Sequence, residues 1–315
     1  MSRGVLHIER SIIYITLGAS LLTAIFSLYR IWKTRNWFHA GLLIVALGVM
    51  GFSSIFFWYT HRSIPPDTHR LLYEGIEYIR DVRSEPRPII IHVIKIDLDT
   101  PGLSFLVTPS ESAVVEAQTT SQFLEAYDLQ LAVNGDFYDT RINEQLDEPV
   151  TPRGLAASHG EIYTQGYIPD WGYNTLYLSA ENEASFIPPD TIYNAISGWQ
   201  MIIQNGVYIP TRNAPYDYIH EPQPRTLFAL DETGETLIII VVDGRQPHYS
   251  EGVTLDELGD IALGYLAYNA LNMDGGGSST LVMEGEVLNS PIHSRIPGNE
   301  RPIANHLGIH AADLK

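Results

Sequence analysis

The densest cluster of residues that could do chemistry is Asn272–Thr280, NMDGGGSST. Its three consecutive glycines allow the backbone to approach a ligand closely and to turn N–H groups towards an anion. Ser278 and Ser279 can add hydroxyl donors, and Asp274 adds a carboxylate. A tight turn between two strands has the same composition, so both interpretations stay open at this point. The spacing fits neither a phosphate-binding P-loop nor a dinucleotide fingerprint, because no lysine follows the glycines and no helical pattern begins there.

The second candidate cluster is Val133–Asp139, VNGDFYD, where an apolar run ends abruptly. Asn134 and Gly135 are followed by two carboxylates, Asp136 and Asp139, around an aromatic pair. Asn-Gly-Asp is a favourable hairpin turn. The functional alternative is an acid at the end of a strand, beside aromatic rings that can stack on a sugar. The residues alone do not separate these two interpretations.

The glycine run ends a pattern of strand, helix and strand, and this pattern must position its acids. The first strand ends in Asp243, a helix is expected over Thr254–Asn269, and the second strand ends in Asp274. Thr254 and Glu257 match a helix capping box. A unit of this size normally lays its two strands parallel. Asp243 and Asp274 should therefore both emerge at carboxyl ends of strands, where open α/β sheets bind ligands.

The rest of the chain is rich in short strand patterns. Runs of β-branched residues are separated by Asn-Gly and Glu-Gly turn pairs, and another helix is expected over Thr119–Asp128. We therefore expect residues 88–315 to form one sheet-rich α/β domain, with a mixed β-sheet and packed helices. Residues 61–87 are interpreted as a linker with a short helix over Leu71–Arg80.

The first sixty residues contain two long uncharged runs, nineteen residues over Ser11–Tyr29 and twenty-four over Trp37–Thr60. At a rise of about 1.5 Å per residue, each run is about as long as the roughly 30 Å hydrocarbon core of a bilayer. Residues 1–60 are therefore expected to be a membrane anchor, a two-helix transmembrane hairpin that meets the bilayer through residues 11–60. The alternatives are a pair of buried core helices, or a signal peptide followed by one span.

The turn between the two runs, RIWKTR, carries three positive charges in six residues. Positive residues concentrate on the cytoplasmic side of membrane proteins, so this turn favours a multi-pass protein of the cell membrane with an extracytoplasmic body. Arg3 and Arg10, which precede the first run, favour the opposite orientation.

Composition excludes several classes of function. The chain carries 37 acidic against 19 basic residues, a net charge of -18. Such a surface repels a phosphate backbone, so a nucleic-acid partner is not expected, and an anionic substrate must be met by a local cluster of arginines. There is no cysteine, which excludes disulfides, zinc-thiolate sites and thiol nucleophiles. Nothing in the sequence indicates an oligomeric state.

Several segments together resemble the phosphodiester glycosidase domain family. The segment VVDGRQPHYSEGVTLDELGDIALGYLAYNALNMDGGGSSTLVMEG is similar, in order and spacing, to that family's DGR, helix and glycine-rich signature. VNGDFYD is similar to its strand-end motif, with Asp136 in place of a glycine and Tyr138 in place of a phenylalanine. PRTLFAL and ERPIANHLGIH resemble segments that supply arginines, here Arg225 and Arg301. The resemblance covers roughly residues 88–312.

The resemblance implies a glycosidase-type hydrolase that cleaves glycosyl phosphodiesters, with a carbohydrate or glycosyl-phosphate substrate. Such a bond is cleaved at the anomeric carbon through a transition state with oxocarbenium character. Arg225 and Arg301 are candidates to stabilise the departing phosphate, which is already a weakly basic anion. Asp243 and Asp274 are candidates for the carboxylate at the sugar. Glu251 is either an acid/base or simply a charge favoured at the entry of the helix.

The expected catalytic set is Asp243, Asp274, Glu251 and Asp136. The expected substrate-binding set is Asn134, Arg225, Arg245, Gly275, Gly276, Gly277, Ser278, Ser279 and Arg301. For Arg245, a structural pairing with Asp243 is the alternative. This chemistry requires no cofactor, although several neighbouring aspartates could bind calcium or magnesium. The alternative function is a non-catalytic module that binds polysaccharide or cell-wall polymer in envelope or exopolysaccharide assembly, and a third is a metal-dependent phosphoesterase.

Overall fold

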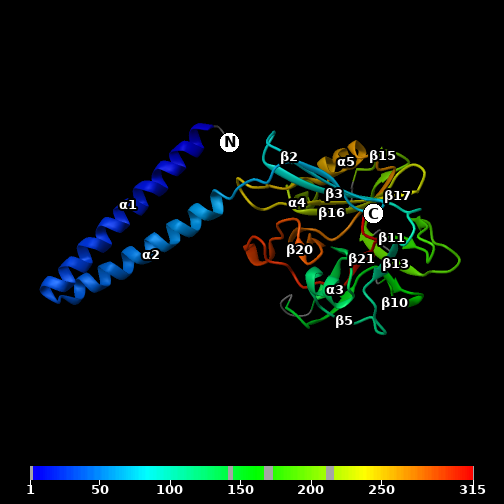
Figure 1. Cartoon of the computed structure of the whole chain (residues 1–315), viewed down its shortest axis with the longest axis horizontal. Coiled ribbons are helices and arrows are strands. Elements are labelled where there is room, and N and C mark those ends of the chain that lie inside the picture. Colours follow the sequence, from blue (N-terminus) through cyan, green and yellow to red (C-terminus); the bar gives the residue numbers. More distant parts are fainter. Residues whose placement is uncertain (1–2, 141–144, 167–172, 211–215, 315) are drawn as a thin grey trace. The chain divides into compact units, whose positions relative to one another are not determined.

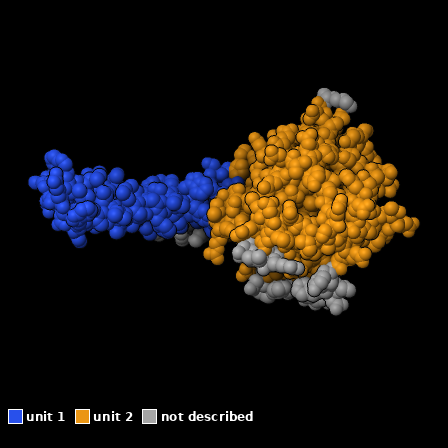
Figure 2. Space-filling model, turned by 90° about the horizontal axis from the view of Figure 1, so that it is seen from below, with its two compact units in different colours: residues 1–64, 247–249 blue, residues 65–246, 250–315 orange. Residues whose placement is uncertain are grey.

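The computed structural model describes residues 3–140, 145–166, 173–210 and 216–314. The chain divides into two compact units, residues 1–64 with 247–249 and residues 65–246 with 250–315, coloured blue and orange in Figure 2. We describe each unit by itself.

The first unit is a pair of long helices, α1 (Arg3–Thr34) and α2 (Trp37–Thr60). They lie antiparallel, side by side, joined by a tight turn in which the Asn36 side chain accepts a hydrogen bond from the Phe38 N–H, 3.0 Å. Both helices contain stretches long and apolar enough to cross a membrane, Ile12–Thr34 and Trp37–Thr60. The expected helical hairpin is thus confirmed. A signal sequence near the N-terminus passes the same test of length and composition, so the membrane crossing itself stays a prediction.

The second unit is built on an eight-stranded sheet in which all neighbouring strands are antiparallel. In spatial order its strands are β1 (Thr68–Tyr73), β2 (Ile76–Arg83), β3 (Ile89–Asp97), β17 (Thr236–Val242), β16 (Arg225–Leu230), β18 (Asn269–Asn272), β14 (Met201–Gln204) and β15 (Val207–Tyr208). The central strands are apolar on both faces because both faces are covered. On β17, for example, Ile239 packs into one core cluster and Ile240 into another.

Two five-stranded sheets and one three-stranded sheet complete the second unit (Figure 1). The first consists of β20 (Glu286–Val287), β19 (Leu281–Met283), β6 (Leu131–Asn134), β21 (His306–His310) and β4 (Ser104–Val107). The next consists of β10 (Glu161–Gln165), β9 (Leu155–Ser158), β13 (Asn194–Trp199), β11 (Tyr173–Leu178) and β12 (Ala184–Ser185). The smallest consists of β5 (Val115–Glu116), β8 (Pro149–Pro152) and β7 (Tyr138–Thr140).

The described helices of this unit are short: α3 (Thr120–Ala126), α4 (Tyr216–His220), α5 (Leu255–Gly264) and the 3-10 turns η2 (Gly276–Ser278) and η3 (His293–Arg295). The expected capping box begins α5, since Glu257 N–H donates to Thr254 Oγ1, 3.1 Å, and Thr254 N–H donates to Glu257 Oε2, 2.8 Å. The apolar face of α5 packs into one core cluster of the large sheet. The predicted class, sheet-rich with packed helices and a preceding helical hairpin, is confirmed.

The helix predicted over Leu71–Arg80 is wrong. This stretch forms the antiparallel strands β1 and β2, joined by a turn in which Gly75 adopts a φ of +69°. Side-chain burial alternates along β2, as is typical of a strand. Ile76 and Tyr78 are buried in the core, whereas Glu77 and Ile79 are less buried. Residues expected to be a linker therefore form the edge of the large sheet.

The expected unit of strand, helix and strand corresponds to β17, α5 and β18, and β16 is inserted between its two strands in the sheet. Strands β17 and β18 are both antiparallel to β16, which lies between them. They therefore run in the same direction, as expected, but are not hydrogen-bonded neighbours. The two strands lie two inter-strand spacings apart, about 9.5 Å, and Asp243 and Asp274 follow their carboxyl ends.

Candidate active site

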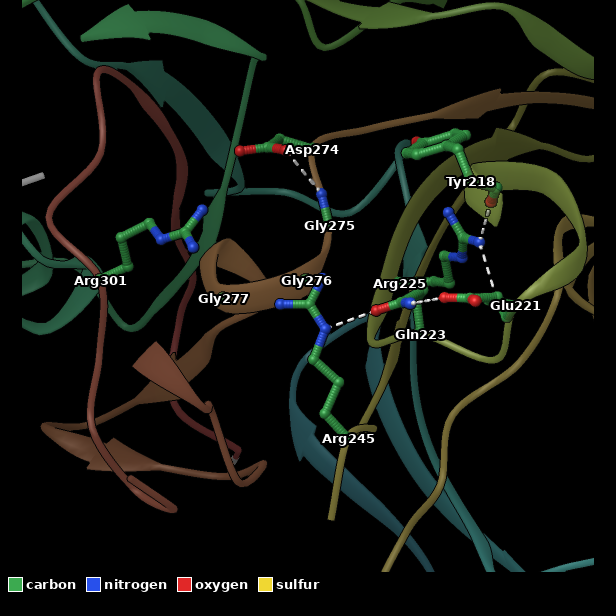
Figure 3. A pocket seen from close by; sticks show the side chains of 10 residues that line it. All are labelled: Tyr218, Glu221, Gln223, Arg225, Arg245, Asp274, Gly275, Gly276, Gly277 and Arg301. Carbon is green, nitrogen blue, oxygen red and sulfur yellow. Dashed lines mark hydrogen bonds between the residues drawn. The ribbon is translucent and has the colours of Figure 1, made fainter. Parts of the chain in front are cut away.

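One cavity of about 350 Å³ brings together segments that lie far apart in the sequence. They are α4 and the segment after it, the first residue of β16, and the loops that follow β17 and β18, together with the stretch before β21. Figure 3 shows the residues that line this cavity: Tyr218, Glu221, Gln223, Arg225, Arg245, Asp274, Gly275, Gly276, Gly277 and Arg301. Most of the substrate-binding residues expected from the sequence thus meet here.

Asp274 is held in a fixed orientation at the end of β18. One carboxylate oxygen accepts the Gly275 N–H, 2.9 Å, and the other accepts the Ser278 hydroxyl, 2.6 Å. Its carbonyl oxygen accepts a hydrogen bond from Asn134 Nδ2, 2.7 Å, at the end of β6. Both donors to the carboxylate stabilise its charged form. The two sequence clusters are therefore joined at this point.

The glycine run makes room for two guanidinium groups. A Cβ on Gly276 would lie 3.0 Å from Arg245 Nη2, and one on Gly277 would lie 2.5 Å from Arg301 Nη2. Gly276 also has a φ of +64°, a conformation that glycine adopts without strain. Figure 3 shows the two guanidinium groups directed towards this run. Because these positions are glycines, the two arginine side chains can pack closely against the backbone of the turn.

Arg245 and Arg301 give the cavity its positive charge. Arg245 Nε donates to Gln223 Oε1, and Arg301 Nη1 lies 3.5 Å from the Ser278 hydroxyl. Burial, together with the charge of Arg301, lowers the pKa of Arg245, while Asp274 acts in the opposite direction. Two neighbouring cations beside one carboxylate form a site that suits an anion such as a phosphate group.

Arg225 lies in the wall of the cavity and is almost wholly buried, 1% exposed. Its Nε donates to the Val253 carbonyl, 3.2 Å, and its Nη2 donates to the carbonyls of Tyr218 and Glu221. The guanidinium also lies 4.7 Å from the centre of the Tyr218 ring. Burial lowers the pKa of Arg225. These bonds give Arg225 a task that the sequence did not reveal, which is to hold the segment around α4 in place.

Asp243 does not line this cavity. Its Oδ1 accepts the Ser290 N–H, 2.7 Å, and Asn289 Nδ2, 3.1 Å, while Oδ2 lies 3.4 Å from His92 Nε2. His92 Nδ1 in turn lies 2.8 Å from the Tyr78 hydroxyl. All of the Asp243 side chain is buried. Because β16 separates β17 from β18, the structure does not bring Asp243 and Asp274 into one cavity, and the contacts of Asp243 tie loops to the sheet.

Glu251 also lies outside the residues that line the cavity. Its N–H donates to the Pro88 carbonyl, 2.9 Å, and its carbonyl accepts the Arg245 N–H, 3.3 Å. The backbone of Glu251 thus supports the loop that carries Arg245.

Asp136 does not line the cavity and is fully buried. Its Oδ1 accepts the Ser197 N–H, 2.6 Å, whereas its Oδ2 has no hydrogen-bond partner among the described residues. Burial raises the pKa of Asp136 well above its usual range, and the charge of Asp274 adds to the increase. Burial therefore favours the neutral form of the Asp136 carboxyl group, whose surroundings include the Asp274 side chain.

Asn134 and Ser279 are buried supports of the glycine turn. Asn134 Oδ1 accepts the Thr226 hydroxyl, 2.8 Å, and the Thr280 N–H, 3.2 Å. The Thr226 hydroxyl also lies 3.2 Å from Ser279 Oγ. Both residues, expected to bind substrate, are engaged with neighbouring strands instead.

Sequence reasoning missed the wall formed by Tyr218, Glu221 and Gln223. The Tyr218 hydroxyl accepts a hydrogen bond from Asn272 Nδ2, 2.9 Å, and its ring lies 5.1 Å from that of Trp199. Burial raises the pKa of Tyr218. A five-residue helix has no periodicity by which a sequence could reveal it. Across the described parts of the chain, no group of three or more histidine, aspartate and glutamate side chains could hold a metal ion.

The fold and this site define a sheet-rich domain with an arginine-lined cavity at the ends of its strands. The model of the phosphodiester glycosidase family matches residues 127–310, and the chain belongs to that family. It is 27% identical over 197 residues to the human N-acetylglucosamine-1-phosphodiester alpha-N-acetylglucosaminidase, covering 58% of this chain and 37% of the relative. The mouse protein of the same name is 28% identical over 176 residues, covering 51% and 33%. The chain thus spans about a third of the length of these curated relatives.

Solved structures show the same fold. The catalytic domain of the zebrafish N-acetylglucosamine-1-phosphodiester alpha-N-acetylglucosaminidase, auto-inhibited by its pro-peptide, superposes with a TM-score of 0.56 at 18% identity, covering 80% of this chain and 85% of that one. A hypothetical protein from Synechocystis superposes with a TM-score of 0.57 at 16% identity, covering 79% and 64%. At these identities the likeness establishes the fold alone.

Proposed function

We propose that this chain is a hydrolase that cleaves glycosyl phosphodiesters between the anomeric carbon and the phosphate oxygen. The observation that carries the proposal is the grouping of Arg245 and Arg301 around the glycine turn beside Asp274 in one cavity. Membership of the phosphodiester glycosidase family supports it, as do the names of the curated relatives.

The proposed roles follow from the charges that develop during the reaction. As the anomeric C–O bond breaks, the phosphate gains negative charge, which Arg245 and Arg301 stabilise. The sugar gains positive charge, which the Asp274 carboxylate stabilises. Water adds its hydroxyl to the anomeric carbon, and its proton ends on Asp274 or on the phosphomonoester that leaves. Asp243, Glu251 and Arg225 do not contact the substrate in this proposal. Their hydrogen bonds position the loops and the helix around the cavity.

The test uses the full chain and a model N-acetylglucosamine-1-phosphodiester, with reducing sugar and phosphomonoester measured together. Equal amounts of both products should appear. Asp274→Asn should lower kcat by about 10²-fold to 10⁴-fold, because it removes the negative charge of the carboxylate beside the sugar while keeping the size and shape of the side chain. Asp190→Asn, at an exposed position outside the cavity, is the matched control and should keep full activity. Full turnover by Asp274→Asn would exclude this mechanism, and binding without turnover by the wild type would favour the polysaccharide-binding alternative.

We also propose that α1 and α2 anchor the protein in the cell membrane as two spans, with the second unit outside the cytoplasm. The length and apolar character of both helices support the anchor. The positive turn between them supports the orientation.

A further inference from the structure

A second cavity, of about 460 Å³, lies at one end of β13 and β21. Strand β13 starts next to Tyr193, in the second cavity, and ends at Trp199, which packs on Tyr218 of the first. Six residues of extended chain span about 20 Å. Strand β21 likewise runs from His306, paired with Asn134, to His310, in the second cavity. The two cavities share no lining residue.

The described residues that line this second cavity are uncharged or weakly basic, in a chain with 37 acidic and 19 basic residues. They are Ser104, Phe105, Leu106, Pro109, Tyr127, His159, Ser179, Ala180, Asn182, Tyr193 and His310. No carboxylate, lysine or arginine is among them. The cavity therefore offers no negative side chain to a metal cation and no permanently positive one to a phosphate. Aromatic rings, imidazoles, an amide and hydroxyls suit a sugar, whose C–H faces pack on rings and whose hydroxyls bond to planar polar groups.

The polar groups of this cavity are held in place before any ligand arrives. The His159 ring lies 5.3 Å from the Tyr193 ring, on a turn in which His159 and Gly160 both have positive φ, 50° and 89°. His159 N–H donates to Asn194 Oδ1, 3.1 Å, and Gly160 N–H donates to the Tyr193 carbonyl, 2.7 Å. Such bonds fix the turn, so little freedom is lost on binding.

Two further side chains border the cavity from other elements. Asn182 Nδ2 donates to the Leu103 carbonyl, 2.8 Å, which fixes the amide while its Oδ1 makes no hydrogen bond with the other described residues. The half-exposed ring of Tyr127 packs on Phe123, with centroids 5.2 Å apart. Two tyrosine rings, a phenylalanine ring, two imidazoles and a fixed amide thus line one cavity.

We propose that this second cavity binds an uncharged glycan segment and is a carbohydrate site separate from the active-site cavity. It holds a neutral stretch of saccharide by ring stacking and hydrogen bonds. This assignment does not depend on turnover, so it can be tested in a chain without activity.

The test measures binding of chitohexaose, cellohexaose and maltohexaose to the full-length Asp274→Asn protein in a detergent without a sugar headgroup. Saturation-transfer NMR and calorimetry report the contact and the affinity. At least one of the three hexasaccharides should bind, and adding Tyr193→Ala should weaken that binding about tenfold or more, because a stacking ring is lost. Tyr268→Ala, at a comparably half-buried tyrosine outside this cavity, is the matched control and should leave the affinity unchanged.

A second variant guards against misfolding of Tyr193→Ala. His159→Asn keeps a residue that tolerates positive φ at the turn, and should also weaken binding. Absence of binding for all three hexasaccharides would overturn the proposal, as would unchanged affinity in both variants. Loss of binding in Arg245→Gln, with the cavity variants unaffected, would instead place the saccharide in the active-site cavity and would also overturn it.

Discussion

At the scale of single residues, the site pairs two carboxyl groups with opposite surroundings. Asp274 accepts hydrogen bonds from a backbone N–H and a hydroxyl and lies near two arginines, which favours its charged form. Asp136 is buried with one oxygen without a partner among the described residues, which favours its neutral form. A pair whose environments separate the two protonation states is typical of acid and base assignments in enzymes.

The raised pKa of Asp136 makes stability depend on pH in a defined direction. The folded chain keeps a proton on Asp136 above about pH 4, where an aspartate of the unfolded chain has lost it. Raising the pH from about 4 towards the folded pKa therefore favours unfolding, by at most about 1.4 kcal/mol per pH unit. An amide in place of this carboxyl group has no proton to lose, so Asp136→Asn should lose less stability than the wild type as pH rises.

The measurement is the free energy of unfolding of both proteins as the pH is raised from about 4, where the Asp136 carboxyl group of the unfolded chain begins to lose its proton. The difference between the two curves isolates Asp136, because the other titrating groups are common to both. Asp190→Asn, at an exposed position, should follow the wild type throughout. Parallel curves for Asp136→Asn and the wild type would show that Asp136 titrates normally in the folded chain.

At the scale of elements, the sequence predicts those features whose signal is local. The Thr254 capping box depends only on neighbours in the chain and is as predicted, whereas the helix that it begins ends at Gly264 rather than at Asn269, where β18 starts. The run from Asp274 to Gly277 is also visible in the sequence, because adjacent glycines and an acid need no tertiary context to stand out. Arg301 required the family resemblance, since an isolated arginine has no local signal.

Features set by tertiary pairing escaped prediction. The insertion of β16 between β17 and β18 determines that Asp243 faces His92 and Asn289 rather than the cavity, and no local pattern encodes that insertion. Leu71–Arg80 contains good helix formers, but its alternating Ile76 and Tyr78 are buried by pairing with β3. In both cases sheet partners decided the outcome.

The hairpin of β1 and β2 should be required for folding of the second unit. A fragment of residues 65–315 retains it, whereas a fragment of residues 88–315 loses three buried side chains, Tyr73, Ile76 and Tyr78. Burial of such side chains is worth about 1.5–3 kcal/mol each, so their sum approaches the whole stability of a typical domain. Loss of β2 also exposes β3 as a long apolar edge.

We therefore expect the 65–315 fragment to be monodisperse and to unfold cooperatively, and the 88–315 fragment to aggregate. Size-exclusion chromatography and thermal unfolding compare the two. A well-folded 88–315 fragment with the same midpoint would support the interpretation of this stretch as a linker.

At the scale of the whole molecule, the charge of the candidate active-site cavity differs from the net charge of the chain. A chain with a net charge of -18 repels anions in general, yet its candidate active-site cavity holds three arginines. A glycosyl phosphodiester would thus be attracted only close to the cavity, whereas a neutral glycan segment is indifferent to the acidic surface. The proposed carbohydrate site would therefore complement the first cavity, because an uncharged saccharide chain is not repelled by the acidic surface of the protein.

The orientation proposed for the membrane anchor rests on the charges that flank its two helices. Two spans return the chain to its starting side, so the orientation is decided by Arg30, Lys33 and Arg35 in the turn against Arg3 and Arg10 before it. With the turn in the cytoplasm, protease added to intact cells should digest the second unit. Replacing Lys33 and Arg35 with glutamine removes two of the three turn charges and should increase the protected fraction. Full protection of the wild-type body in intact cells, with digestion after permeabilisation, would establish the reverse orientation.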